Sequence, residues 1–287
     1  MNFSKLYLFL KDSLRRNYHR QKWLMYNYGD LNRRIKRKRV NVYYFKRAGG
    51  VDNVGDLLSP VIVDFMKKHN GIVDKPLNRT VRLFAIGSIM DLASSDMVVW
   101  GSGLRTNNSL PPTVNFDIRA VRGPQTRNKL LNSGFSCPEI FGDPALLLPL
   151  FYYPDVEKKN DYIIIPHYSK ESRVPQKYNN HMVSTITSDW KGFINEILAS
   201  NYVITGSLHG LIIAEAYGIP AVLLSSEIDK DFFKYEDYYY STNRTSFKVG
   251  SSLEEVLNNR IYNDPIENLK QIQDNLISSF PIDIWKN

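Results

Sequence analysis

Short β-branched and aromatic runs alternate with helical patterns from residue 40 onward, and this alternation restricts the possible folds more than any other feature. The runs predict strands at 40–45, 82–86, 97–100 and 118–121, and the helical patterns lie at 56–69 and 124–132. Strands that alternate with helices indicate a parallel sheet, because parallel strands need long crossover connections. We therefore predict an α/β fold.

The same alternation restarts after a proline-rich interval at 144–154. It predicts strands at 162–165, 202–205 and 221–225, helices at 190–199 and 208–217, and a last helix at 265–279. We predict two Rossmann-like domains, residues 40–150 and 151–287, that face a cleft, with the last helix able to pack back on the first domain. Ligands of such folds bind at the carboxyl ends of the strands.

The formal charge of +8 is concentrated in residues 1–39, a basic segment that contains 12 of the 37 Lys/Arg and two of the 29 Asp/Glu. The rest of the chain has a net charge of −2. Apolar and aromatic side chains recur at a helical period over 3–28, so this segment is expected to be helical. Three interpretations stay open: a solvated helix or arm, a helix attracted to an anionic membrane surface, and a binder of RNA or another acidic partner. The last of the three is the least favoured, because nucleic-acid-binding domains carry their basic surface on the fold that reads the nucleic acid, and we therefore expect no nucleic-acid partner.

A single cysteine, Cys137, excludes an internal disulfide and favours a reducing compartment. No run of 18 apolar residues is present, and charged residues at 12, 15 and 16 interrupt the apolar stretch that a signal peptide would need. The sequence thus predicts a cytoplasmic protein and leaves open a peripheral attachment to the inner face of the cell membrane.

The strongest local motif spans residues 202–220 and combines a strand, a glycine turn and the start of a helix. It places His209 in the first helical turn. Backbone N–H groups at a helix start attract anions, and the helix dipole adds about 0.3–1 kcal/mol. His209 is therefore either a proton-transfer group near neutral pH or only a cap of the turn. The neighbouring residues that could bind an anion are Gly206, Ser207, Leu208 and Gly210.

Polar residues also follow the strands of the predicted first domain. Arg119 and Arg122 end a strand, where an arginine fork suits a planar carboxylate or a phosphate, or else the pair is bound to neighbouring carboxylates such as Asp117. Asn53 and Asp56 follow the first strand, and Asp56 is either a cleft residue or the N-cap of the next helix. Asp143 ends the first half, where it orients a substrate hydroxyl or only satisfies a turn.

Two further candidates lie in the predicted second domain. His167 and Tyr168 follow its first strand and point to the same cleft, although a lone histidine at such a place is more often structural. Lys234 stands among the aromatic residues of 233–240, a combination that suits sugar stacking or the core of a loop.

Several chemistries lack their sequence motifs. No phosphate-binding P-loop, no Gly-x-Gly-x-x-Gly fingerprint, no metal-ligand spacing and no Gly-x-Ser-x-Gly nucleophile turn occurs. A group transfer without a metal or a cofactor fits the remaining motifs best.

Seven motifs together resemble the polysaccharide pyruvyl transferase family, most of all its exopolysaccharide ketal-pyruvate transferases. The motifs are Asn53-Val-Gly-Asp56, Ala85-Ile-Gly-Ser88, Trp100-Gly-Ser-Gly103, Arg119-Ala-Val-Arg-Gly-Pro124, Gly142-Asp-Pro144, Pro166-His-Tyr168 and Ser207-Leu-His-Gly210. The resemblance implies a fold like that of GT-B glycosyltransferases, phosphoenolpyruvate as the donor, and an acceptor sugar, lipid-linked in such pathways, that gains a pyruvate ketal.

The resemblance also implies roles for individual residues. His209 takes the position of the family's general acid/base. Some members carry an arginine where this chain has Ser207, so the donor anion must rely on Arg122, with Arg105 and Lys234 as the next candidates. Two alternatives stay open: a nucleotide-sugar-dependent glycosyltransferase of similar architecture, and a non-catalytic glycan-binding assembly protein.

Overall fold

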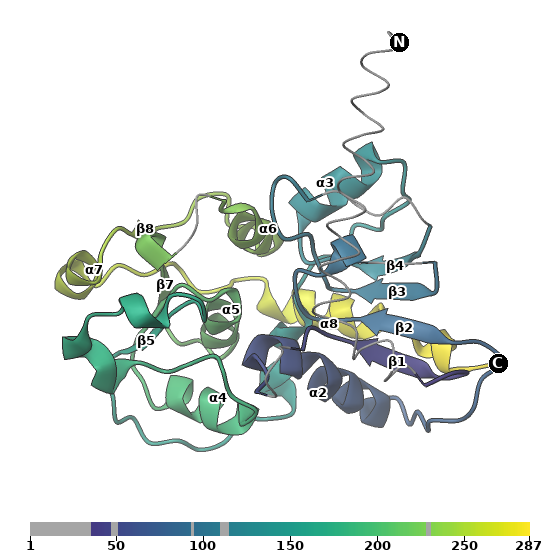
Figure 1. Cartoon of the computed structure of the whole chain (residues 1–287), viewed down its shortest axis with the longest axis horizontal. Helices are drawn as coiled ribbons and strands as arrows, with labels where there is room; N and C mark the ends of the chain where they lie inside the picture. The colour runs from purple at the N-terminus through teal and green to yellow at the C-terminus, as the bar shows by residue number, and fades with distance from the viewer. Residues whose placement is uncertain (1–35, 47–50, 93–94, 110–114, 228–230) are drawn as a thin grey trace, which may run out of the picture.

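The computed structural model describes residues 36–46, 51–92, 95–109, 115–227 and 231–287, so the basic helix predicted at 3–28 lies outside the described residues. Two four-stranded parallel sheets form the framework, one in each half of the chain (Figure 1). Their strand orders are β1-β2-β3-β4 and β5-β6-β7-β8. The predicted α/β class is therefore confirmed.

The first sheet follows the predicted strands to within two residues. It consists of β1 (Val40–Tyr43), β2 (Val81–Phe84), β3 (Met97–Trp100) and β4 (Asp117–Ala120). The connecting elements are α2 (Val54–His69), the 3₁₀ turn η1 (Met90–Leu92) and, after β4, α3 (Pro124–Asn132). All four residues of β3 are buried and apolar, as expected for a parallel strand covered on both faces.

Helix α2 begins at Val54, two residues before the predicted start, because Asn53 is its N-cap. The Asn53 Oδ1 atom accepts a hydrogen bond from the Gly55 N–H at 3.0 Å. The alternative in which Asp56 caps this helix is therefore wrong, and the Asp56 carboxylate is left for other contacts.

The second half contains more elements than the sequence patterns predict. Its strands are β5 (Ile163–Ile165), β6 (Val203–Thr205), β7 (Ala221–Leu224) and β8 (Val249–Gly250). Its helices are α4 (Trp190–Leu198), α5 (Leu208–Ala216), α6 (Phe233–Ser241) and α7 (Leu253–Asn259), with 3₁₀ turns η3 (Glu171–Arg173), η4 (Gln176–His181) and η5 (Ser225–Glu227). The elements β8, α6 and α7 have no counterpart among the predicted ones.

A 3₁₀ segment, η2 (Pro144–Leu150), occupies the proline-rich interval and lies at the centre of the molecule. It contacts α2, α5 and α8, and its residues Ala145, Leu146, Leu147 and Leu148 are fully buried. One apolar cluster includes these residues together with side chains of both sheets. The two halves are therefore joined through a shared apolar core.

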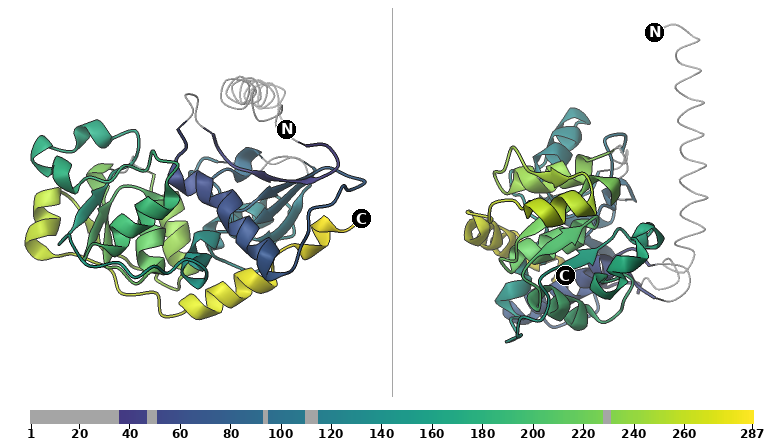
Figure 2. Two further views of the ribbon diagram at one scale, coloured as in Figure 1. Left: turned by 90° about the horizontal axis from the view of Figure 1, so that it is seen from below. Right: turned by 90° about the vertical axis from the view of Figure 1, so that its left-hand side faces the viewer.

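The chain ends on the first half. Helix α8 (Leu269–Ser278) and the turn η6 (Ile282–Trp285) run from the second half back along the first (Figure 2). Gln273 Nε2 donates a hydrogen bond to the Leu146 carbonyl at 2.8 Å, and Trp100 Nε1 donates one to the Leu276 carbonyl at 2.9 Å. No helix among the described residues is both long enough and apolar enough to cross a bilayer.

Candidate active site

The histidine motif folds as a strand, a turn and a helix start, as its sequence predicts. Ser207 is the N-cap of α5, and its hydroxyl accepts a hydrogen bond from the Gly210 N–H at 3.3 Å. Thr205 Oγ1 accepts from the Ser207 N–H at 2.9 Å and donates to the Ile165 carbonyl at 2.8 Å, which fixes the turn against β5. His209 is therefore the second residue of a rigidly held helix, and Leu208 beside it is buried.

The His209 ring lies between two polar segments of the first half. Its Nε2 atom is 3.7 Å from Oδ2 of Asp143, and neither atom has a hydrogen-bond partner although both are buried. On the other side lies Gly55, where an added Cβ would stand only 2.0 Å from His209 Nδ1. The side chain of His209 is 13% exposed and that of Asp143 is 1% exposed. The ring thus fills a narrow place between the halves.

Asp56 belongs to the same cluster of ionisable groups. Burial raises its pKa to about 6, while the positive charges of His209, Arg105 and Lys234 act in the opposite direction. Three predicted site residues, Arg105, His209 and Lys234, therefore lie close enough to Asp56 to influence its charge. A carboxyl that titrates near neutral pH beside a histidine is characteristic of functional clefts, although structural networks also produce such shifts.

Asn53 has a joining role in addition to capping α2. Its Nδ2 atom donates to Thr185 Oγ1 at 3.4 Å, and the Val54 N–H donates to the Thr185 carbonyl at 2.8 Å. Asn53 therefore connects the first half to a loop of the second half beside His209.

His167 and Tyr168 follow β5, whose last residue, Ile165, accepts a hydrogen bond from the Gly206 N–H at 3.0 Å. They lie at the sheet edge from which α5 starts, and their two rings are 4.6 Å apart.

Arg122 differs from the expectation of a donor clamp in an open cleft. Its side chain is fully buried, and its guanidinium lies 3.0 Å from Asp237, an acidic residue of α6 in the other half. The same guanidinium donates to Ser88 Oγ and to the Leu104 carbonyl, both at 2.6 Å. The alternative in which this arginine pair is bound to carboxylates is confirmed: Arg119 binds Asp117 at 2.7 Å, and the carboxylate partner of Arg122 is Asp237, which is distant along the chain. Arg122 is thus an internal link between the halves, and a ligand would have to displace its partners to reach it.

The aromatic segment 233–240 also corrects an expectation. It forms α6, and Tyr235, Tyr238 and Tyr239 are buried, so these rings are helix core and present no face for sugar stacking. Tyr235 instead donates its hydroxyl proton to the Gly206 carbonyl at 2.8 Å, just before the His209 helix. The sequence analysis did not predict the hydrogen bond from Tyr235 to Gly206 or the ion pair of Asp237 with Arg122, although both residues lie in segment 233–240.

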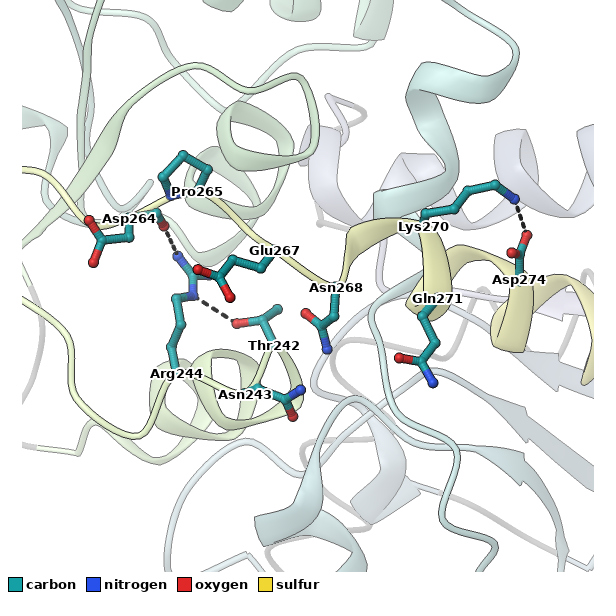
Figure 3. Close-up of a pocket in the computed structure, with 10 residues that line it drawn as sticks. All are labelled: Thr242, Asn243, Arg244, Asp264, Pro265, Glu267, Asn268, Lys270, Gln271 and Asp274. Atoms are coloured by element: carbon teal, nitrogen blue, oxygen red, sulfur yellow. Dashed lines mark hydrogen bonds and ion pairs between the residues drawn. The ribbon is translucent and has the colours of Figure 1, made fainter.

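A polar pocket of about 710 Å³ lies between the end of α6 and α8, and none of the predicted site residues lines it (Figure 3). Arg244 in this pocket pairs with Glu215 at 2.6 Å and donates to the Asp264 carbonyl at 3.0 Å. The pocket is therefore separate from the His209 cluster. Within the described ranges, no group of three or more His, Cys, Asp or Glu side chains could hold a metal ion.

One comparison with known proteins bears on the sequence motifs. Residues 113–227, which include η2, β5, β6 and α5, match the family model described as polysaccharide pyruvyl transferase, so the resemblance is confirmed over that segment. An uncharacterised protein of Acanthamoeba polyphaga mimivirus is 25% identical over 247 residues, which cover 79% of this chain and 83% of the viral one. The crystal structure of a functionally uncharacterised protein from Klebsiella pneumoniae subsp. pneumoniae covers 84% of this chain and 94% of its own, with 14% identity and a TM-score of 0.46.

Proposed function

We propose that this chain, whose central segment matches the polysaccharide pyruvyl transferase family, transfers the enolpyruvyl group of phosphoenolpyruvate to a sugar of a polysaccharide or a lipid-linked oligosaccharide. The product is a pyruvate ketal, and phosphate is released. Phosphoenolpyruvate is a co-substrate in this scheme, which uses no separate cofactor. The two parallel sheets joined at one core are compatible with a GT-B-like pair of Rossmann-like domains, and we extend the proposal to that arrangement.

One observation carries the proposal: His209 stands at a helix start inside the family-matched segment, among groups from both halves of the chain. The helix start offers an anion the N–H groups of Leu208 and His209, because those of Gly206, Ser207 and Gly210 already donate to other acceptors. Histidine is the side chain that most often transfers protons in enzymes, a role worth about 10²–10⁴ in rate. Protonation and anion binding are therefore available at one place.

The chemistry needs both functions. A protonated His209 gives its proton to the methylene carbon of phosphoenolpyruvate, and this creates an oxocarbenium-like centre at the adjacent carbon. A sugar hydroxyl attacks that centre and returns its proton to His209. The carbon–oxygen bond to phosphate then breaks, the second hydroxyl attacks, and its proton leaves with the phosphate. Preorganised positive groups around the carboxylate and the phosphate stabilise the charged states.

We assign the donor anion to Arg105, Lys234 and the N–H groups of Leu208 and His209, because Arg122 is already bound to Asp237 in the core. Both cations lie close enough to affect Asp56. We assign the acceptor sugar to Asp56, Asn53, His167 and Tyr168. Asp143 contacts the Nε2 side of the His209 ring. We expect Arg105→Gln and Lys234→Gln each to raise KM for phosphoenolpyruvate more than they lower kcat.

The proposal is tested by incubating the purified chain with phosphoenolpyruvate and a panel of galactosides, glucosides and mannosides. Phosphate release and a new ketal methyl signal are expected, and His209→Ala should lower the rate at least about 10²-fold. His69→Ala is the matched control, because His69 is the exposed last residue of α2. Full activity of His209→Ala would refute its role. A melting temperature raised by nucleotide sugars and not by phosphoenolpyruvate would favour a glycosyltransferase, and glycan binding without turnover would favour an assembly protein.

We also propose that residues 1–39 bring the enzyme to an anionic membrane, where lipid-linked acceptors are found. Each basic residue near such a surface contributes about 1 kcal/mol. Deleting residues 1–38 should abolish cosedimentation with phosphatidylserine-containing vesicles and leave binding to phosphatidylcholine vesicles unchanged. Undiminished cosedimentation of the shortened chain would show that the basic segment has another use.

A further inference from the structure

We propose that Asp143 is a positioning residue that holds His209 with its proton on Nε2, so that Nδ1 is the atom that exchanges the proton with the substrate. This inference rests on the proposed function of His209. It assigns each ring nitrogen a separate task, one toward the protein interior and one toward the reaction.

The Asp143 carboxylate cannot rotate freely. Its Oδ1 atom accepts a hydrogen bond from the Ala145 N–H at 3.0 Å as the N-cap of η2, and the next residue, Pro144, has a fixed backbone angle φ. The side chain is 1% exposed. One carboxylate oxygen is thus engaged by the backbone, and the geometry directs the other, Oδ2, toward His209.

The Asp143 and His209 atoms that face each other are both buried and polar. Oδ2 of Asp143 and Nε2 of His209 are both buried without a hydrogen-bond partner, and the 3.7 Å between them leaves no room for a bridging water molecule. A separation of this size is common between catalytic partners in the absence of substrate and closes when a ligand binds. An ionised carboxylate only accepts hydrogen bonds, so the imidazole must be the donor, and Nε2 must carry the hydrogen.

The other ring nitrogen, Nδ1, faces the start of α2. Nδ1 faces the backbone of Gly55, a residue without a side chain, and the next residue along α2 is Asp56, whose carboxyl responds to the charge of His209. A neutral imidazole has one N–H, so a hydrogen on Nε2 leaves a lone pair on Nδ1. Nδ1 is therefore the atom that takes the hydroxyl proton and, when charged, delivers a proton to the methylene carbon.

The test is the tautomer of His209, measured by nitrogen-15 NMR of the full chain labelled at histidine and assigned by comparison with His209→Ala. The spectrum is recorded at a pH above the titration of the ring. The Nε2–H form is expected in the unchanged chain. In Asp143→Asn the amide oxygen keeps the bond from Ala145, its NH₂ group faces Nε2 as a donor, and the hydrogen should move to Nδ1.

The tautomer expected in Asp143→Asn has no lone pair on Nδ1, so this variant should be slow in catalysis. Asp143→Asn should lower kcat at least about 10²-fold with KM for phosphoenolpyruvate changed less than about threefold. Asp143→Ser keeps a capping oxygen without a group that reaches His209, so it should lower kcat and leave the two tautomers mixed. Asp189→Asn is the matched control, because Asp189 caps α4 in the same way at an exposed position; it should change neither the tautomer nor kcat.

An Nδ1–H form in the unchanged chain, or the same tautomer in Asp143→Asn as in the unchanged chain, would overturn the inference. The NMR measurement needs no substrate, so it separates this inference from the proposed function. The expected tautomer without any pyruvyl transfer would leave the positioning intact and refute the activity. If His209→Ala abolishes transfer but the ring of the unchanged chain carries its hydrogen on Nδ1, the proposed activity stands and the positioning role of Asp143 is refuted.

Discussion

Replacing Gly55 by alanine is a direct test of how tightly the His209 ring is held. Gly55 is a buried residue near the start of α2 and has no positive φ, so the backbone itself tolerates alanine. The added Cβ would lie 2.0 Å from Nδ1, 2.5 Å from Cγ and 2.8 Å from Cε1 of His209, whereas ordinary contact begins at 3.4 Å. The ring must therefore move by at least about 1.4 Å.

Two opposing terms set the effect on stability. Overpacking of a buried site costs about 1–3 kcal/mol, whereas alanine favours a helix over glycine by up to about 1 kcal/mol. The net loss of unfolding free energy should thus be about 0–2 kcal/mol. Catalysis is more sensitive, because a misplacement of about 1 Å can cost about 10²-fold in rate. We expect a folded protein with about one hundredth of the pyruvyl-transfer rate.

A double-mutant cycle with His209→Ala isolates the contact. Urea unfolding is measured for the unchanged chain, both single variants and the double variant. Without the imidazole, Gly55→Ala should be neutral or stabilising by up to about 1 kcal/mol, so the two sites should couple by about 1–3 kcal/mol. Equal destabilisation by Gly55→Ala in both backgrounds, or an unchanged transfer rate of the single variant, would refute the reasoning.

Three further predictions concern buried ionisable groups. Asp237→Ala leaves the Arg122 guanidinium buried without its carboxylate, so the free energy of unfolding in urea should fall by about 3–5 kcal/mol; weaker binding of phosphoenolpyruvate at unchanged stability would instead identify Arg122 as a donor ligand. The pKa of Asp56 is raised to about 6 by burial, so the folded state binds more protons than the unfolded state between about pH 4 and 6, and unfolding free energy should fall by about 2–3 kcal/mol as the pH rises through this window. Asp56→Asn should remove that loss in urea titrations at several pH values, whereas Asp64→Asn on the same helix should not. Burial raises the pKa of Cys137 to about 11, so its thiol should resist iodoacetamide at pH 7.5 in the native chain and react fully in urea; rapid modification of the native chain would contradict this.

The sequence could predict what depends on neighbours along the chain. The strands of the first sheet lie within two residues of their predicted positions. Strand β3 is a buried parallel strand with a continuous apolar run, whereas the edge strands β1 and β4 alternate apolar and polar residues. The turn that presents His209 is also as predicted, because it depends on the local pair of Thr205 and Ser207. Strand β8 has only two residues, too few for a pattern, and it exists because β7 offers an edge.

Pairings between distant residues could not be predicted in this way. Arg122 and Asp237 are 115 positions apart, and nothing near either residue indicates that they meet. The aromatic residues of α6 suggested a sugar platform because composition shows ring faces and charges without showing which of them are covered. The contact of Asp143 with His209 likewise depends on how η2 is packed between the halves.

The position of α8 at the end of the chain has a consequence for synthesis on the ribosome. The hydrogen bond of Trp100 with Leu276 can form only after Leu276, 176 residues later in the chain, is synthesised, and the hydrogen bond of Leu146 with Gln273 is similarly delayed. At about 5–20 residues per second, roughly 10–35 s separate the synthesis of Trp100 from that of its cover. During that time the nascent first half exposes an apolar surface that chaperones can bind. A chain cut before α8 would lack both contacts, so α8 completes the packing of the first half.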